Sequence, residues 1–345
     1  MPLNSCLRVS AAMKRILMVG DYRTGSGPAN VTLKYIEGLG KRCFYLHSAS
    51  KPLRAAELIL KIPFSSVVLC SGYSAQNILS AKTAHFFGKK CAYLDHGSVE
   101  YENRINLCED PHMTRIEYET LRLCDRIFAV SSRFSLWLKE RYPEFSDKTE
   151  PQLNGIGDFD RVYRDSTERD PDLIFSIGGG MPRKRINRIC QAIELLLPKR
   201  PGLKLVVAGA EGAFSEEIRR YPFVRDLGIL DKESIRKLFR SSSLFIQNSC
   251  FETFGLAPME ALANGCDVLL SAHTGALELF RTDEPGLERY IIKDCEDASE
   301  IARRINESLG SGNAALFRKA VKETSSWEVR TEELYQKLRS LSISE

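Results

Sequence analysis

Two glutamates, Glu252 and Glu260, lie eight positions apart in a segment whose residue types could bind a phosphorylated ligand. A buried strand is predicted at residues 244–248. A helix is predicted to begin near Leu256 and to end at Gly265, since glycine often follows a helix. Carboxylates on both sides of a helix start suit a ligand with hydroxyls at both ends and phosphate in the middle, such as a nucleotide sugar. The free amides that would face the phosphate are those of Phe254, Gly255 and Leu256.

A second loop favours binding over the alternative that both glutamates are merely solvated residues on a helix face. Residues 177–186 read Ile-Gly-Gly-Gly-Met-Pro-Arg-Lys-Arg-Ile, between a predicted strand and a predicted helix. Its glycines would let the backbone approach a phosphate. Arg183, Lys184 and Arg185 are unfavourably placed at a helix start unless an anion compensates them. The loop therefore predicts a clamp for a diphosphate leaving group.

The first half of the chain offers a histidine and two glycines. His96 precedes a glycine at the end of a predicted strand, so we expect it to face a cleft at the carboxyl edge of the sheet, with Asp95 orienting it. Gly25 and Gly27 follow the first predicted strand. The second strand ends at residues 46–48, Leu-His-Ser, without the acid that a dinucleotide fold uses, which argues against NAD.

The segment around the two glutamates resembles the E-x7-E motif of family 4 glycosyltransferases, which are retaining enzymes of the GT-B fold. The family usually has Pro-Ser before the first glutamate, where this chain has Asn248-Ser249. The resemblance covers nearly the whole chain from Met13, and its specific motifs lie mostly in the second half. The residues that carry it are Glu252, Phe254, Gly255, Leu256, Glu260, Ala261 and Gly265.

The resemblance implies roles for the candidate catalytic residues. Glu252 would contact the donor sugar, and His96 would lie close to that sugar. Lys184 and Arg183 would stabilise the departing diphosphate, while Glu260 would bind the ribose hydroxyls. The departing phosphate oxygen would act as the base, so no protein nucleophile is required.

The chain departs from the family in the glycine-rich loop. The family has an arginine where this chain has Gly179, and either Arg183 or Arg185 could replace it. Softer matches near the donor and the hinge are Ser131, Asn154, Gly155, Thr274, Gly275 and Glu278. The residues expected to bind the nucleotide sugar are Glu260, Phe254, Gly255, Leu256, Gly25, Gly27, Gly179, Gly209, Ile229 and Leu230.

Short apolar runs alternate with helical patterns along the chain, which predicts an α/β fold with parallel, doubly wound sheets. Two such domains in tandem would enclose an interdomain cleft. The resemblance implies the GT-B architecture, with a last helix that crosses back to the first domain. Strands are predicted at 16–19, 43–46, 67–70, 91–94, 126–130, 173–177, 203–208, 244–248, 267–270 and 289–292. Helices are predicted at 29–39, 75–86, 115–123, 185–197, 232–240 and 256–264.

Composition changes suggest where the domains meet. Residues 1–12 lack the apolar stretch of a signal peptide and are predicted to be a disordered extension. A polar stretch rich in Gly, Pro, Asp and Arg follows the first set of strands. We expect an acceptor domain at 13–157, a linker at 158–171, a nucleotide-sugar domain at 172–326 and a crossover helix at 327–345.

Composition also limits cofactors and partners. The net charge of +4 is too small to indicate a nucleic-acid partner, and it would permit peripheral contact with an anionic membrane surface. The ten cysteines lack the spacing of a zinc site or a disulfide framework, which favours a reducing cytoplasm. Asp158 and Asp160 form a D-x-D pattern, but it falls in the predicted linker. We therefore expect neither a metal nor another cofactor.

The sequence predicts a cytoplasmic retaining glycosyltransferase, with contact to the inner membrane surface as an option. Its donor would be a UDP- or GDP-sugar, and its acceptor a saccharide or lipid-linked hydroxyl in cell-surface polysaccharide or glycoconjugate synthesis. One alternative is a non-hydrolysing nucleotide-sugar epimerase, for which His96 and Glu252 are the candidate acid and base. The other is an inactive nucleotide-sugar-binding subunit.

Overall fold

The computed structural model describes residues 15–157, 168–281 and 283–343, which form two α/β units with one parallel six-stranded sheet each. The first sheet has the strand order β2-β1-β3-β4-β5-β6. All of its neighbouring strands run parallel, with Ile16 opposite Val67 and Val67 opposite Lys90. Its strands are β1 (Ile16–Gly20), β2 (Cys43–Tyr45), β3 (Val67–Ser71), β4 (Lys90–Asp95), β5 (Arg126–Ala129) and β6 (Thr149–Pro151).

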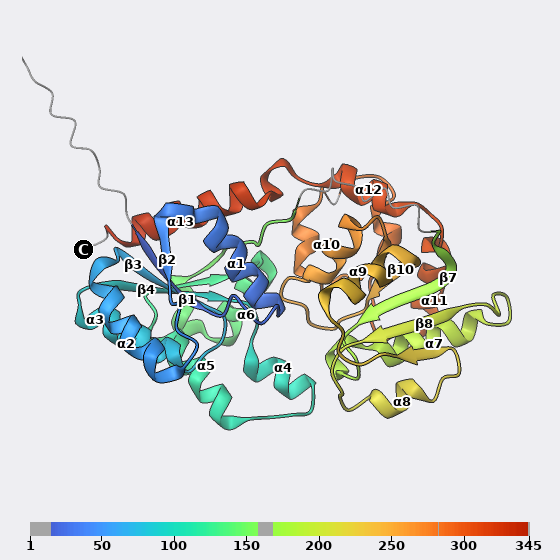
Figure 1. Cartoon of the computed structure of the whole chain (residues 1–345). Coiled ribbons are helices and arrows are strands. Elements are labelled where there is room, and N and C mark those ends of the chain that lie inside the picture. The colour runs from blue at the N-terminus through green and yellow to red at the C-terminus, as the bar shows by residue number, and fades with distance from the viewer. Residues whose placement is uncertain (1–14, 158–167, 282, 344–345) are drawn as a thin grey trace, which may run out of the picture.

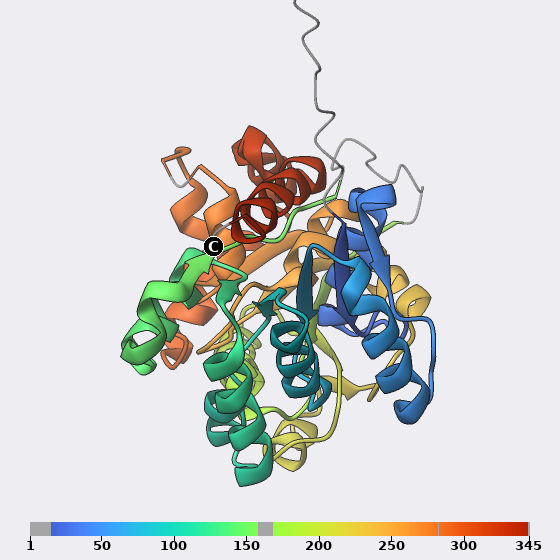
Figure 2. The same cartoon turned by 90° about the vertical axis from the view of Figure 1, so that its left-hand side faces the viewer.

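The helices of the first unit cover both faces of this sheet. Strands β2 and β3 pair with opposite sides of β1, so the direction of strand addition reverses after β2. Because crossovers between parallel strands are right-handed, the helices after β2 lie on the face opposite α1. Figures 1 and 2 show this division, with α1 on one side and α2, α3 and α5 on the other. The helices are α1 (Gly27–Leu39), α2 (Lys51–Lys61), α3 (Gln76–Phe86), α4 (Val99–Ile105), α5 (Pro111–Leu123) and α6 (Ser132–Arg141).

The second sheet repeats the doubly wound plan with the order β12-β11-β10-β7-β8-β9. Its central strand β10 is buried along its whole length, which is typical of a strand covered on both faces. The strands are β7 (Asp170–Ile177), β8 (Lys204–Ala208), β9 (Val224–Asp226), β10 (Ser242–Gln247), β11 (Asp267–Ser271) and β12 (Ile291–Ile292). The helices are α7 (Ile186–Leu196), α8 (Ser215–Arg219), α9 (Lys232–Ser241), α10 (Leu256–Ala263), α11 (Ala298–Ser308) and α12 (Asn313–Ala320).

The last helix, α13 (Trp327–Leu341), leaves the second unit and packs on the first (Figure 1). The indole of Trp327 meets the ring of Tyr35 on α1 edge to face, with centroids 5.4 Å apart. Arg42 Nη1 and Glu332 Oε2 form an ion pair at 2.6 Å on the same side. The predicted fold class, two tandem Rossmann-like units with a C-terminal helix that crosses back, is therefore confirmed.

Several elements were not predicted from the sequence. The edge strands β6 and β9 are only three residues long, and Pro151 at the end of β6 resembles a linker residue. The helices that were missed are α2, α4, α6, α8, α11 and α12. Strand β7 begins at Asp170, inside the predicted linker 158–171, most of which lies outside the described residues, as do residues 1–12. The domain bounds themselves stay a prediction.

The cysteines in the described ranges are free thiols, and most are buried. Cys70 and Cys91 lie with their sulfurs 3.8 Å apart within the first core and fill space there as small apolar side chains. Among the helices that the structure describes, none has the length and apolar character needed to cross a bilayer.

Candidate functional site

Strand β10 and helix α10 hold the segment that contains the two glutamates. Gly255 precedes the helix with a φ of 96°, and no side chain caps the helix start. A Cβ at Gly255 would lie 2.8 Å from Gln247 Nε2, so the tight turn requires glycine. Gly265, with a φ of 72°, follows the helix as predicted. The turn leaves the N-terminal end of α10 open to an anion.

Glu252 lies at the centre of a buried charge cluster. Its Oε2 accepts a hydrogen bond from Lys184 Nζ at 2.6 Å and one from Ser249 Oγ at 3.2 Å. The side chains of Glu252 and Lys184 are only 12% and 14% exposed. Burial opposes ionisation of Glu252, but the charges of Lys184 and Arg183 outweigh it and hold the pKa of the carboxyl below its ordinary value. Burial also lowers the pKa of Lys184, which Glu252 partly offsets.

Arg183 joins this cluster from the same loop and links it to the first unit. Its Nη2 lies 3.1 Å from Glu102 Oε2, and its Nη1 donates to Phe251 O at 3.0 Å. Nη1 also lies 3.5 Å from Glu252 Oε2. Arg185 points elsewhere and forms an ion pair with Glu296. Of the two arginines that could replace the one missing at Gly179, only Arg183 therefore lies beside Glu252.

The glycines of this loop are required for packing. A Cβ at Gly179 would lie 2.0 Å from Ala210 O, and a Cβ at Gly209 would lie 2.5 Å from Gly179 N. The turns after β7 and β8 therefore touch back to back, and an arginine cannot replace Gly179 without moving them. The amides of Gly178 and Gly179 already donate to Ala208 O, at 2.8 and 3.0 Å. Their first role is thus to bring the two turns together.

His96 directly follows the end of β4. Its Nε2 lies 3.1 Å from Ser71 Oγ, which lies 2.8 Å from Thr32 Oγ1. Burial lowers the pKa of His96 to about 4, so the ring is neutral at pH 7. The carbonyl of His96 accepts a hydrogen bond from Thr253 Oγ1 at 2.6 Å, which ties the histidine loop to the residue after Glu252.

The prediction that Asp95 orients His96 is wrong. Asp95 Oδ1 accepts a hydrogen bond from Gly97 N at 3.1 Å, and the ring of His96 is hydrogen-bonded to Ser71 instead. Complete burial and the nearby Glu117 raise the pKa of Asp95 well above its usual range. Asp95 stabilises the loop that carries the histidine and forms no hydrogen bond with the imidazole ring.

The glycine loop after β1 approaches the same helix start. A Cβ at Gly27 would meet Leu256 Cδ1 at 3.6 Å, and Gly25 lies beside Lys232 with a φ of 77°. Lys232 Nζ also donates to Asn30 Oδ1 at 2.7 Å. The structure thus places Gly25 and Gly27 of the first unit against the second unit, and their contact with the donor stays a prediction.

Glu260 lies at the outer edge of this arrangement. Its side chain is exposed, and its carboxylate has no hydrogen bond or ion pair with any residue that the structure describes. Partial desolvation by its surroundings raises the pKa of the Glu260 carboxyl above its ordinary value, and the charges of Lys232 and Arg236 on α9 offset this only in part. Ile229, 80% exposed, and the partly buried Leu230 precede α9. Glu252 and Glu260 therefore sit on one segment in different environments.

Sequence reasoning missed how several residues hold the two units together. Ser131 Oγ donates to Thr253 O at 2.6 Å. The carboxylate of Glu278 accepts hydrogen bonds from the amides of Ser132 and Arg133, both at 2.9 Å. Ser131 and Glu278 had been noted only as soft matches. Their partners lie more than 120 positions away along the chain, so no local pattern could reveal the pairing.

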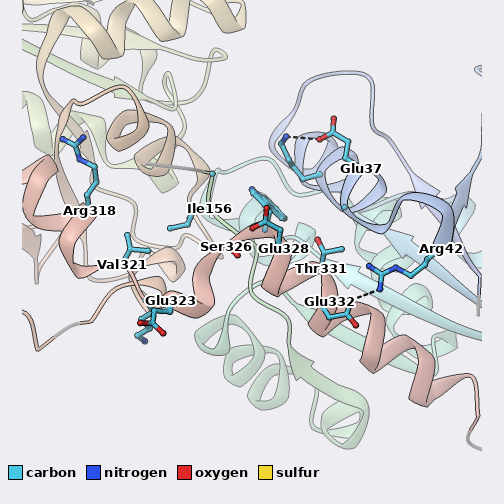
Figure 3. A pocket seen from close by; sticks show the side chains of 15 residues that line it. Glu37, Arg42, Ile156, Arg318, Val321, Glu323, Ser326, Glu328, Thr331 and Glu332 are labelled. Carbon is cyan, nitrogen blue, oxygen red and sulfur yellow. Dashed lines mark hydrogen bonds and ion pairs between the residues drawn. The ribbon is translucent and has the colours of Figure 1, made fainter. Parts of the chain in front are cut away.

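Two hollows lie close to the interface. One, of about 210 Å³, is lined by aromatic side chains from both units and by Glu252. Its aromatic residues are Tyr101, Phe134, Trp137 and Phe251. The other, of about 1180 Å³, runs between α1, α13 and the end of α12, with Glu37, Arg42, Arg318 and Trp327 on its walls (Figure 3). It borders Gly157, where the described chain stops, and contains none of the predicted site residues.

Among the described residues, no group of His, Cys, Asp and Glu side chains is arranged to hold a metal ion. Asp158 and Asp160 lie outside the described residues. The expectation that no metal is needed therefore stays a prediction.

Comparison with known proteins finds sequence similarity over part of the chain. The sequence profile described as Glycosyl transferases group 1 matches residues 160–324. O-antigen chain mannosyltransferase B of Escherichia coli is 30% identical over 141 residues, which are 39% of this chain and 35% of that protein. An uncharacterized glycosyltransferase of Methanocaldococcus jannaschii is 28% identical over 127 residues, 35% of this chain and 32% of that protein. These matches span about a third of the length of each relative.

Solved structures resemble the chain over nearly its whole length. HepE of Anabaena in complex with UDP-glucose has a TM-score of 0.67 at 14% identity and covers 94% of this chain and 99% of its own. A sucrose-phosphate synthase of Thermosynechococcus elongatus has a TM-score of 0.66 at 15% identity and covers 95% and 99%. Identities of this size show a shared fold. The chain thus has the GT-B fold, and residues 160–324 are similar in sequence to group 1 glycosyltransferases.

Proposed function

We propose that the chain is a retaining, family 4-type glycosyltransferase that transfers a sugar from a UDP- or GDP-sugar to a hydroxyl of a saccharide or lipid-linked acceptor. The observation that carries the proposal is the buried cluster of Glu252, Lys184 and Arg183 beside the open start of α10. HepE, which has a similar structure, forms complexes with UDP-glucose and with UDP, and one relative in sequence is a mannosyltransferase. Synthesis of a cell-surface polysaccharide or glycoconjugate is consistent with that relative's name.

The cluster provides positive charge where the reaction would create negative charge. When the bond between the anomeric carbon and the phosphate oxygen breaks, negative charge grows on the diphosphate. Lys184, Arg183 and the amides at the start of α10 would stabilise that charge, which is usually the largest catalytic contribution of such a site. In the structure Lys184 is paired with Glu252, so an arriving diphosphate would share a cation that is already held in place.

The remaining residues would position the two ends of the donor. Glu252 would accept hydrogen bonds from the sugar hydroxyls, and Glu260, whose carboxylate is unpaired, would accept those of the ribose. The acceptor hydroxyl would attack the anomeric carbon from the face that the diphosphate leaves. Its proton would pass to the departing phosphate oxygen, so that configuration is retained without a protein nucleophile.

The protonation states favour transfer over epimerisation. An epimerase of this architecture needs one acid and one base beside the sugar. His96 has its pKa lowered to about 4, and the pKa of Glu252 is also lowered, so both are unprotonated at pH 7. The site therefore offers two acceptors of protons and no donor among the two candidates.

The inactive-subunit alternative rested on the arginine missing at Gly179. Arg183 Nη1 lies 3.5 Å from Glu252 Oε2, so Arg183 could supply the positive charge that the missing arginine would bring. Its placement supports an active enzyme.

The decisive experiment is a turnover assay over a panel of UDP- and GDP-sugars, with and without simple sugar acceptors. We expect transfer or slow hydrolysis of one donor, with a product that keeps the donor's anomeric configuration in NMR spectra. Turnover should persist in EDTA, because cations and helix amides take the place of a metal. Interconversion of epimers, or binding in a thermal-shift assay without turnover of any donor, would refute the proposal. Loss of activity in EDTA with recovery in magnesium would refute its metal-independent part.

A further inference from the structure

Half of the large apolar side chains that the described chain exposes lie within one stretch of the first unit. Seven of the fourteen fall between residues 53 and 87. Phe86, Phe64 and Leu60 are exposed to 84%, 78% and 71%. Exposed apolar side chains are ordinary when scattered, but a concentration of this kind marks an interaction surface. The seven are Leu53, Ile59, Leu60, Phe64, Leu79, Phe86 and Phe87.

Helix α2 presents an apolar stripe to solvent in addition to the side that it buries. Leu58 is fully buried against the first unit. Leu53, Ala56, Leu60 and Phe64 are exposed and follow one another at intervals of three, four and four residues, which places them along one side of the helix and its short continuation Ile62–Phe64. A helix that needed only to cover the sheet would carry polar residues there.

Helix α3 extends this stripe into one surface. Leu79, Lys82 and Phe86 are exposed at intervals of three and four residues. The two helices lie on the same face of the sheet, and Arg54 Nε of α2 donates to Gln76 Oε1 of α3 at 3.2 Å. Both run antiparallel to the strands, so Phe64 and Phe86 lie at the same end of the sheet. We call the set the α2–α3 surface: Leu53, Ala56, Ile59, Leu60, Phe64, Leu79, Phe86 and Phe87, with Lys51, Lys82 and Lys89.

The stretch that contains these two helices is strongly basic. Residues 50–90 contain six Lys and Arg residues against a single acid, Glu57, which is a net charge of +5 in a chain whose total is +4. Glu57 is already engaged, by Lys61 Nζ at 2.6 Å and by the amide of His47. No hydrogen bond or ion pair within the described residues is recorded for the side chains of the α2–α3 lysines. They are Lys51, Lys82 and Lys89.

We propose that the α2–α3 surface docks the protein on an anionic lipid bilayer. Exposed aromatic and leucine side chains would enter the boundary between headgroups and acyl chains, and the unpaired lysines would meet anionic headgroups. A second copy of the chain fits less well, because a symmetric contact would bring the three lysines of both copies together without any acid on the surface.

The position of the surface is compatible with work on a lipid-linked acceptor. In Figure 1, α2 and α3 lie at the end of the first unit that is farthest from the second unit. Docking there would leave the second unit, with its glutamates and cations, free of the bilayer. The inference goes beyond the proposed function and stands on the surface alone, so it survives even if the donor proves not to be a nucleotide sugar.

Flotation with lipid vesicles tests the proposal without any nucleotide sugar. Vesicles of phosphatidylglycerol and phosphatidylcholine in equal parts should capture the protein, and phosphatidylcholine vesicles should not. The variant Lys51→Gln/Lys82→Gln/Lys89→Gln should weaken capture on the order of 100-fold, since each cation near an anionic surface contributes roughly a factor of five. Phe64→Ser/Phe86→Ser should also abolish most capture, at any salt concentration.

Leu136→Ser/Leu195→Ser is the matched control, because it removes two exposed leucines elsewhere and should leave capture unchanged. A melting curve for each variant confirms that it is folded. Capture that is equal on both vesicle types, or that survives both variants, would overturn the proposal. So would a dimer of the parent protein in solution that Phe64→Ser/Phe86→Ser dissociates, because the surface would then be an interface between copies.

Discussion

The two ends of the Glu252–Glu260 segment are eight residues apart and differ in almost every electrostatic respect. Glu252 is buried, and Lys184, Arg183 and Ser249 surround its carboxylate. Glu260 is exposed, and its carboxylate has no recorded partner among the described residues. The carboxylate of Glu252 is thus paired with cations in the free protein, whereas the carboxylate of Glu260 is available to accept hydrogen bonds from a ligand.

The difference assigns different tasks to the same residue type. A carboxylate that is already compensated by fixed cations is poised to respond when charge moves nearby, which is what a reacting centre requires. An unpaired carboxylate at the rim is suited to hydrogen-bond the hydroxyls of a bound ligand, which serves affinity. The comparison therefore predicts that substitution of Glu252 lowers mainly kcat and that substitution of Glu260 lowers mainly the affinity for the nucleotide.

Glu252→Gln should give the largest effect in turnover. We expect kcat to fall by about 100-fold or more, because the substitution removes a charge beside the bond that breaks. The affinity for UDP or GDP should stay the same or rise, since Glu252 no longer competes for Lys184. Steady-state kinetics and titration calorimetry measure the two quantities. Glu102→Gln, which removes the other carboxylate of Arg183, is the control and should reduce kcat far less. Equal losses of kcat and affinity in Glu252→Gln would contradict this assignment.

Lys184→Ala should weaken nucleoside-diphosphate binding and turnover together. The loss of a charge-assisted contact costs about 1.5–3 kcal/mol, which is roughly a 10- to 150-fold change in affinity. Arg185→Ala offers a matched control in the adjacent residue, because Arg185 is paired with Glu296 and not with Glu252. An affinity that Lys184→Ala leaves unchanged, or that Arg185→Ala lowers equally, would remove the clamp from this loop.

Sequence patterns within a short segment predicted the strand and the helix that carry the two glutamates. The apolar run of β10, the start of α10 at Leu256 and the glycine after its end were all visible in the sequence. Lys184 and Glu252 were predicted to contact the same donor. They follow β7 and β10, which are neighbours in the sheet, and Lys184 Nζ lies 2.6 Å from Glu252 Oε2.

The contacts that sequence could not predict depend on how the two units close. Glu102 lies on a seven-residue helix with no distinctive pattern, and it becomes a partner of Arg183 only across the interface. Gly179 departs from the family, and its reason is visible only where the turn of Gly209 presses against it. Asp95 was assigned to His96 by adjacency, although the geometry of the strand end directs the ring to Ser71.

Glu260→Gln should have a moderate effect confined to binding. If Glu260 holds the ribose, the donor and the free nucleoside diphosphate should both bind about 10-fold more weakly or worse, because both carry that ribose. The ratio of kcat values should stay near one at saturating donor. A paired titration with Glu252→Gln separates the two glutamates. No change in diphosphate affinity in either variant would mean that the spacing of the two residues is a coincidence on a helix surface.

The smallest expected effect concerns the histidine that is tied to the Glu252 end. Burial lowers the pKa of His96 to about 4, below the value near 6.5 of an unfolded chain. A depressed histidine pKa means that the unfolded state binds the extra proton first. The native state thus loses stability as the pH falls below 6.5 and stops losing it near 4. Between pH 7.5 and 5.5 this amounts to about 1 kcal/mol of unfolding free energy, which His96→Asn should remove from the pH dependence.

Urea unfolding at both pH values measures the difference. His112→Asn, at an exposed histidine, controls for the loss of any histidine. If His96→Asn kept the full pH dependence of the parent, the ring would be solvated, and the closed contact between Thr253 and the His96 loop would not persist in solution.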